Sequence, residues 1–100
     1  MAAEPVVLIN SFEVPAGQEE AFLRFWETSR DFLSKQEGYL STRLHRSLAP
    51  DAEFRFVNVA CWQSAQAFQK ATSQPEFRAA GSPYRFHAAL YQITVDDQES

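Results

Sequence analysis

The order of strand-type and helix-type segments restricts the fold of this chain more than any other feature. Apolar, β-branched strand segments alternate with segments whose apolar residues recur every three or four positions, as on one face of a helix. The strands are expected at Pro5–Val14, Gly38–Leu48, Phe54–Trp62 and Phe86–Val95. With the helices between them, the order is β-α-β-β-α-β. This is the split βαβ, or ferredoxin-like, α+β arrangement, in which a four-stranded antiparallel sheet carries its helices on one face.

The first helix is expected from Gln18 to Gln36. Glu19 and Glu20 suit its N-terminus, where the helix dipole is positive, and Gly38 ends it. One face of this helix collects residues at three- and four-residue spacing: Phe22, Phe25, Trp26, Ser29, Phe32 and Leu33.

Two shorter helical segments are expected in the second half of the chain. One covers residues 63–73, with Ser64 as its N-cap. Pro75 can begin another helical turn, which Gly81 closes. Between the second and third strands, Pro50 and Asp51 supply a turn, so these two strands should form an antiparallel hairpin.

Composition and charge exclude several classes of function. One hundred residues are expected to form a single domain over 1–100. The net charge is −4, and the 9 Lys and Arg are scattered among 13 acidic residues, so nucleic-acid binding is not expected. Cys61 is the single cysteine, which excludes an internal disulfide and a cysteine zinc site.

The N-terminal stretch "MAAEPVVLIN" has neither the positive segment nor the long apolar segment of a secretion signal. The apolar runs of the chain are too short to span a bilayer. We therefore expect a soluble, cytoplasmic protein with no membrane partner.

The strands are apolar on both faces, although helices can cover only one. In the third strand, one face holds Phe54, Phe56, Asn58, Ala60 and Trp62, and the other holds Val57, Val59 and Cys61. A large exposed apolar face would promote aggregation, so a second copy is expected to cover it. The sequence therefore predicts a homodimer.

Asn58 and Trp62 are the first candidates for a functional site. Asn58 interrupts an apolar face of the third strand, and Trp62 lies four residues later, where a helix begins. A buried amide or indole needs a hydrogen-bond partner, and each could find one in the other. Asn10 interrupts the first strand in the same way, and the first and third strands are expected to be central neighbours. These three residues either pack a core or line an apolar small-molecule pocket under an aromatic helix.

The other candidates are aromatic residues and histidines. Phe22, Phe25 and Trp26 of the first helix are expected to cover such a pocket, and Phe56 shares the face of Asn58. His87 opens the last strand and could point inward as a general base, or be a structural or surface residue. No metal-ligand cluster, phosphate loop or nucleophile motif accompanies these residues.

The chain resembles the antibiotic biosynthesis monooxygenase family of dimeric α+β barrels over nearly its whole length. The resemblance includes "VVLINSFEVPAGQEEAFLRFW", "EGYLSTRLHRSL", "FVNVACWQSAQAF" and "PEFRAAG", with "CWQSAQAF" as its best signature. It implies a pocket between sheet and helices in each subunit. It also implies oxidation of phenolic or anthrone-type substrates by O2 with no metal, flavin or haem. Asn58 and Trp62 match an Asn and a Trp, four residues apart, at the active site of that branch.

The haem-degrading branch of the same family uses an Asn on the first strand, the strand-end Trp and a His on the last helix. Asn10 and Trp62 match the first two, but Gly81 occupies the place expected for the His. The leading hypothesis is therefore a cofactor-independent monooxygenase or quinol oxidase-like enzyme. The alternatives are a non-catalytic dimeric small-molecule-binding protein and, third, a haem-binding or haem-degrading enzyme.

Overall fold

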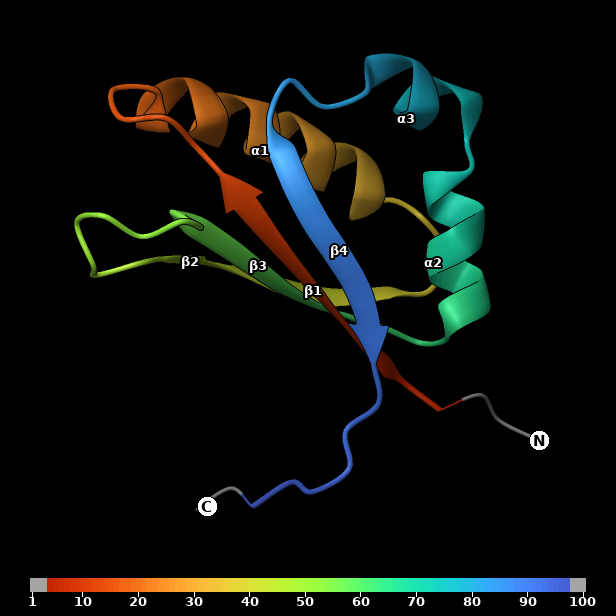
Figure 1. Ribbon diagram of the computed structural model, residues 1–100. Helices are drawn as coiled ribbons and strands as arrows, with labels where there is room; N and C mark the ends of the chain where they lie inside the picture. The colour runs from red at the N-terminus through yellow and green to blue at the C-terminus, as the bar shows by residue number, and fades with distance from the viewer. Residues whose placement is uncertain (1–3, 98–100) are drawn as a thin grey trace.

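The computed structural model describes residues 4–97, so the first three residues of the N-terminal stretch discussed above lie outside the described part. The expected order of strands and helices is confirmed, with the second helical region divided in two (Figure 1). The elements are β1 (Val6–Glu13), α1 (Glu19–Leu33), β2 (Tyr39–Arg46), β3 (Phe56–Trp62), α2 (Ala65–Thr72), α3 (Pro75–Ala80) and β4 (Arg85–Tyr91).

The sheet has the order β2-β3-β1-β4, and each neighbouring pair is antiparallel. The three helices lie on one face of this sheet, as Figure 1 shows. The central position of β1 and β3 is the one expected from the sequence. Their register places the Cα of Asn10 directly opposite that of Asn58.

The strands are shorter than expected at the ends where they lose a partner. β4 ends at Tyr91 instead of Val95, because Tyr91 pairs with Val7, next to the first residue of β1. β2 and β3 separate beyond the pair Arg46–Phe56. The loop between them is held by the Arg55 guanidinium, which donates to the carbonyls of Ser47, Ala49 and Pro50 at 3.1, 3.0 and 2.7 Å.

Two local features fix how α2 joins the sheet. The Ser64 hydroxyl accepts a hydrogen bond from the Ala67 amide at 3.1 Å, which confirms the expected N-cap. Gly38 has φ +92°, and its backbone runs so close to α2 that an added Cβ would overlap the Cβ of Ala67. The carbonyl of Gly38 also accepts a hydrogen bond from the Gln63 amide at 2.8 Å. The start of β2 and the start of α2 are therefore locked together.

The core between sheet and helices contains two clusters of buried side chains. One is built on Leu8, Ala60, Trp62 and Ala71, and the other on Phe12, Phe22 and Phe56. Phe22 is 0% exposed and Trp62 is 1% exposed. The two clusters lie at opposite ends of the helix-covered face.

The other face of the sheet carries no helix of residues 4–97. Its central residues are only half-buried, although most are apolar: Val7, Ile9, Val57, Val59 and Cys61. We call this surface the open face. None of the helices in the described part is long and apolar enough to cross a membrane.

Candidate functional site

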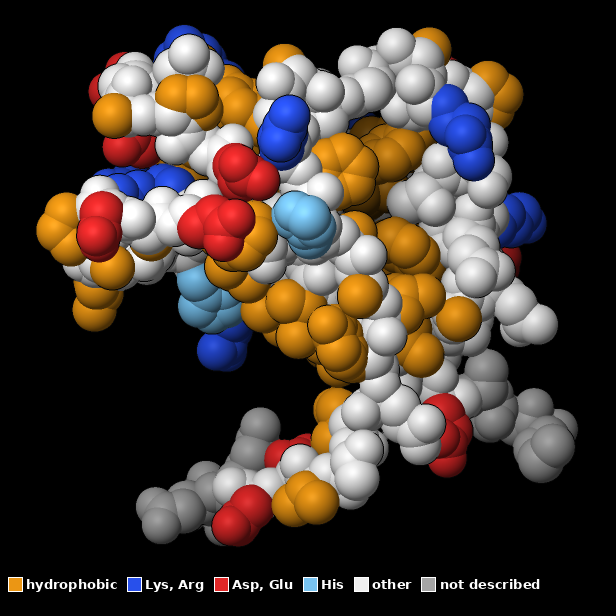
Figure 2. Space-filling view, viewed as in Figure 1, with side chains coloured by type: hydrophobic (Ala, Val, Ile, Leu, Met, Phe, Trp, Pro, Cys, Tyr) orange, Lys and Arg blue, Asp and Glu red, His pale blue; other side chains and the backbone are white. Residues whose placement is uncertain are grey.

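A cavity of about 430 Å³ lies between the sheet and the helices. The sheet provides its floor through β1 and β3, and α1 and the segment from α3 to Ser82 provide its walls. Arg78, Ser82 and Phe86 are exposed as well as lining, so they mark its mouth. Figure 2 shows hydrophobic side chains recessed between β4 and the α2–α3 segment. The volume falls in the ordinary range of small-molecule sites.

Two amides, Asn10 and Asn58, meet on the floor of this cavity. The Thr42 hydroxyl donates to Oδ1 of Asn58 at 2.5 Å, which leaves the amide N–H groups of Asn58 for a ligand. Oδ1 of Asn10 is buried and has no hydrogen-bond partner among the described residues. An unpaired buried oxygen costs free energy unless a ligand or water donates to it. The floor therefore offers both a donor and an acceptor to one polar group.

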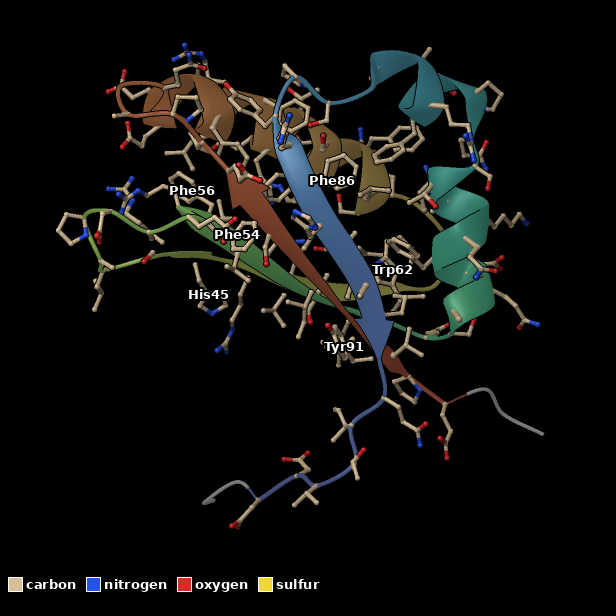
Figure 3. The ribbon with its side chains drawn as sticks, viewed as in Figure 1. His45, Phe54, Phe56, Trp62, Phe86 and Tyr91 are labelled. Carbon is tan, nitrogen blue, oxygen red and sulfur yellow. The ribbon has the colours of Figure 1, made fainter. Side chains whose placement is uncertain are left out.

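Trp62 closes the end of the cavity at the start of α2. Its ring lies edge to face with Tyr39, at a centroid distance of 5.5 Å, and with Phe68, at 5.6 Å. Figure 3 shows Trp62 between the sheet and α2, and Phe86 beneath α1. The sequence allowed a bond between Asn58 and the Trp62 indole, but the hydrogen-bond partner of Asn58 is Thr42. Trp62 lines the cavity and also belongs to the first core cluster.

The α1 wall of the cavity is a single helical stripe. It consists of Phe25, Trp26, Ser29, Arg30 and Leu33. The Arg30 guanidinium lies over the Trp26 ring, 5.2 Å from its centroid, and its Nε donates to Oδ1 of the neighbouring Asp31 at 3.1 Å. The stripe thus combines aromatic surface with one cation.

Most of the residues singled out from the sequence meet in this cavity. Asn10, Asn58, Trp62, Phe25 and Trp26 all line it. The fully packed alternative, in which the aromatic residues of α1 fill this space, does not hold for Phe25 and Trp26.

Phe22 and Phe56 were expected to line the pocket and do not. Their rings stack on each other at a centroid distance of 4.7 Å, inside the second core cluster. Phe22 also packs against Phe12, near the end of β1, at a centroid distance of 4.9 Å, so its ring supports the cavity from the side. The sequence could not separate Phe22 from Phe25, because both lie on the same apolar face of α1, nor Phe56 from Asn58, because both lie on the same face of β3.

His87 was a candidate for the pocket wall, and the structure places it elsewhere. It pairs with Ser11 across β1 and therefore points to the open face, away from Asn10. Its Nε2 lies 3.9 Å from a Glu13 carboxylate oxygen, and its side chain is 69% exposed. His45 also points to the open face, as Figure 3 shows. Neither histidine of the chain lines the cavity.

Several lining residues were missed by the sequence analysis: Tyr39, Thr42, Arg30, Phe77 and Arg78. The sequence could have indicated Arg30, because it lies one helical turn after Trp26 on the same face of α1. Nothing in the sequence indicated Thr42 or Tyr39, since a bulge between Tyr39 and Ser41 shifts the alternation of β2.

Tyr39 supplies a phenol beside Trp62. Burial raises the pKa of Tyr39 above its usual value of 10.0, against a smaller opposing effect of the Arg30 charge. The phenol therefore stays protonated at neutral pH, so its O–H group can donate to a ligand. Across residues 4–97, no three His, Cys, Asp or Glu side chains gather where they could hold a metal ion.

The sequence matches a known family and one curated relative. The profile of the family described as antibiotic biosynthesis monooxygenase matches residues 5–82. The deoxynogalonate monooxygenase of Streptomyces nogalater is 33% identical over 75 residues, which is 75% of this chain. The chain spans 61% of the length of that relative.

Solved structures share the fold over nearly the whole chain. A candidate monooxygenase from Shewanella loihica PV-4 is 44% identical with a TM-score of 0.84, covering 96% of this chain and 99% of that one. SnoaB, a cofactor-independent oxygenase from Streptomyces nogalater, is 25% identical with a TM-score of 0.83, covering 97% and 100%. A heme-degrading protein from Mycobacterium tuberculosis is 27% identical with a TM-score of 0.71, covering 97% and 99%.

Proposed function

This chain belongs to the antibiotic biosynthesis monooxygenase family, and we propose that it is a cofactor-independent monooxygenase acting on a small phenolic or anthrone-type substrate with O2. The observation that carries the proposal is the cavity in which Asn10, Asn58 and Trp62 meet. Trp62 packs in the first core cluster as well as lining the cavity, but a core-packing role would leave no space beside Asn10 and Asn58. Here they border about 430 Å³ of aromatic-lined volume, enough for a small ring system.

The proposed reaction needs no external reductant. An anthrone loses a proton from its CH2 group, and the resulting carbanion, written equally as a phenolate, gives electrons to O2. Carbon and oxygen join as a hydroperoxide, which then loses water as the O–O bond breaks and a carbonyl forms. One oxygen atom enters the quinone and the other leaves as water, so the substrate supplies all four electrons.

The floor amides act where negative charge develops. The N–H groups of Asn58 donate to the substrate oxygen as it becomes an anion, and preorganised donors of this kind stabilise such charge strongly. Oδ1 of Asn10 accepts from a neighbouring hydroxyl of the substrate, which satisfies its missing hydrogen bond. Trp62 stacks against the ring, and the surrounding aromatic residues keep water away from the reacting carbon.

A specific observation favours a second candidate, a non-catalytic small-molecule-binding protein. Neither histidine lines the cavity, and neither does any carboxylate, so the chain places no ordinary general base there. In the enzyme, the substrate proton would leave to water, helped by the oxyanion contacts of Asn58. Haem is poorly suited to this cavity, because His45 and His87 both lie on the open face and cannot ligate iron from within it.

The two candidates are separated by oxygen uptake across a panel of anthrones, naphthols and quinols. Wild-type protein is compared with Asn58→Ala and Trp62→Phe, and His87→Ala on the open face serves as the matched control. We expect uptake above the uncatalysed rate, a fall of at least about tenfold in the two cavity variants and no change in the control. Folding of each variant is checked by circular dichroism. Uptake that equals the uncatalysed rate, or that is the same in all variants, would contradict the enzyme.

A homodimer formed through the open face accompanies this proposal. The half-buried apolar residues of β1 and β3 on that face have no cover within the described chain. A second copy packed sheet to sheet would bury them, as two apolar sheet faces do in a barrel-like dimer.

A further inference from the structure

We propose that the cavity contains an anion subsite formed by Arg30 and Arg78, so that its ligand is an aromatic compound carrying a carboxylate as well as a hydroxyl group. This inference rests on the proposed aromatic pocket and names the charge of its ligand. Arg30 comes from α1 and Arg78 from α3, and both line the cavity.

The charge of the lining is opposite to that of the protein. The chain carries 13 acidic and 9 basic residues, yet the lining contains two arginines and no Asp or Glu. Arg78 lies at the mouth of the cavity and Arg30 is paired with Asp31, so one net positive charge remains beside the aromatic walls, where solvent screens it less than on an open surface. An anion is therefore favoured there, although the protein as a whole repels anions.

Both arginines have guanidinium N–H groups that can donate to an anionic ligand. The Nε of Arg30 donates to Asp31, and stacking on Trp26 fixes the guanidinium, so its terminal N–H groups remain for a second acceptor. Arg78 has no carboxylate within 4.0 Å among residues 4–97. Guanidinium groups bind carboxylates through paired, charge-assisted hydrogen bonds.

A simpler role for both arginines is stabilisation of helix ends. Arg30 lies in the last turn of α1 and Arg78 in the last turn of α3, where cations interact favourably with the helix dipole. That role does not require either side chain to border the cavity, and it predicts no preference for a charged ligand. The two roles therefore differ in the predicted ratio of affinities for a charged ligand and for its uncharged ester.

The positions of the polar groups set the shape of the ligand. Asn10 and Asn58 lie on the sheet floor, whereas the arginines belong to the helix side, and Trp26, Phe77 and Trp62 provide apolar surface for the ring. A ligand that satisfies both sets has a hydroxyl or carbonyl at one end of an aromatic ring system and a carboxylate at the other.

The test compares 1,8-dihydroxyanthraquinone-3-carboxylate with its methyl ester, which has the same rings and no charge. Both compounds are already oxidised, so binding is measured apart from turnover. Isothermal titration calorimetry gives the affinities, and the fluorescence of Trp26 and Trp62 reports occupation of the cavity directly. We expect the acid to bind at least about tenfold more tightly than the ester.

The variants assign this preference to the two side chains. Arg30→Gln and Arg78→Gln should each reduce the preference several-fold, and the double variant should abolish it. Arg78→Lys should keep most of it. Arg24→Gln, on α1 but outside the cavity lining, is the matched control and should change nothing. Circular dichroism confirms that each variant is folded.

Equal binding of acid and ester by the wild type would overturn the anion subsite and leave the oxygenase proposal to its own oxygen-uptake test. A preference that persists in the double variant would overturn the assignment to Arg30 and Arg78. Failure of both compounds to bind would overturn the inference as a whole, and oxygen uptake on uncharged anthrones would then still decide the proposed function.

Discussion

Asn10 holds a polar atom in a place that folding alone does not favour. Its Oδ1 is buried without a hydrogen-bond partner in the described structure, next to an amide that has one. Buried unpaired groups of this kind persist at functional sites, where a ligand completes them. Replacing Asn10 with leucine should therefore change the stability of the protein in the opposite direction to the same replacement at Asn58.

We predict that Asn10→Leu stabilises the protein by about 1 kcal/mol, because it removes an unsatisfied oxygen and keeps a similar volume. Asn58→Leu, the matched control, should destabilise it by about 1–3 kcal/mol, because Thr42 then loses its acceptor. Urea denaturation measures both changes. A destabilised Asn10→Leu variant would show that this oxygen is satisfied in solution.

Thr42 is a positioning residue for Asn58. Its hydroxyl holds the amide so that the N–H groups, and not the oxygen, are available to a ligand. A ligand anion would meet the wrong end of the amide if this bond were lost, since the Asn58 side chain could then rotate.

We predict that Thr42→Val lowers oxygen uptake on any accepted substrate about tenfold and lowers stability by about 1 kcal/mol. Ser41→Ala, the neighbouring residue on the exposed side of β2, should change neither quantity. Asn58→Ala in the Thr42→Val background should add little further loss, because both substitutions remove the same oriented donor. Additive losses would mean that Thr42 acts independently of Asn58.

At the level of elements, the junction between β2 and α2 decides where Trp62 lies. Gly38 begins this junction with a positive φ, and α2 packs directly against it through Ala67. Phe68 of the same helix packs against the Trp62 ring. A shift of α2 would therefore move the end wall of the cavity.

We predict that Gly38→Ala destabilises the protein by about 2 kcal/mol or more, from backbone strain combined with the overlap with Ala67. Gly17→Ala is the matched control, because Gly17 also has a positive φ, +87°, but nothing lies within 4 Å of an added Cβ. It should cost only the strain, about 1 kcal/mol. Thermal denaturation compares the two, and equal losses would contradict the close packing at Gly38.

At the scale of the whole molecule, the two faces of the sheet differ in how well their apolar residues are covered. The helices cover one face, and the other presents apolar residues of β1 and β3 to the surroundings, together with the exposed Tyr91 of β4, which pairs with Val7. In Figure 3, Tyr91 points away from the helices. Such a surface is stable in water mainly when another surface covers it.

We predict a homodimer by sedimentation equilibrium, and a monomer after Val59→Lys, which places a charge at the centre of the open face. Arg43→Lys, on the same face of β2, keeps the charge of that position and should leave the dimer intact. Binding of the aromatic ligand to the monomeric variant would show that each subunit carries a complete cavity. A monomeric wild-type protein would contradict the role of the open face.

Local sequence determined the elements and their order. The periodicity of α1, the Ser64 cap, the two helical segments after it and the central place of β1 and β3 were all predictable, because they depend on residues close together in the chain or on topology. That Asn10 and Asn58 interrupt apolar strand faces, and that Trp62 lies where β3 leads into α2, was visible in the sequence for the same reason.

Tertiary structure alone decided which side chains face the cavity. Because both faces of the strands are apolar, alternation could not tell whether His87 points inward, and only its pairing with Ser11 places it on the open face. Likewise, Phe22 and Phe25 share one face of α1, and only the position of α1 along the sheet packs one ring and leaves the other beside empty space. Cavities depend on the distance between elements that are far apart in the sequence, and periodicity carries no information about that distance.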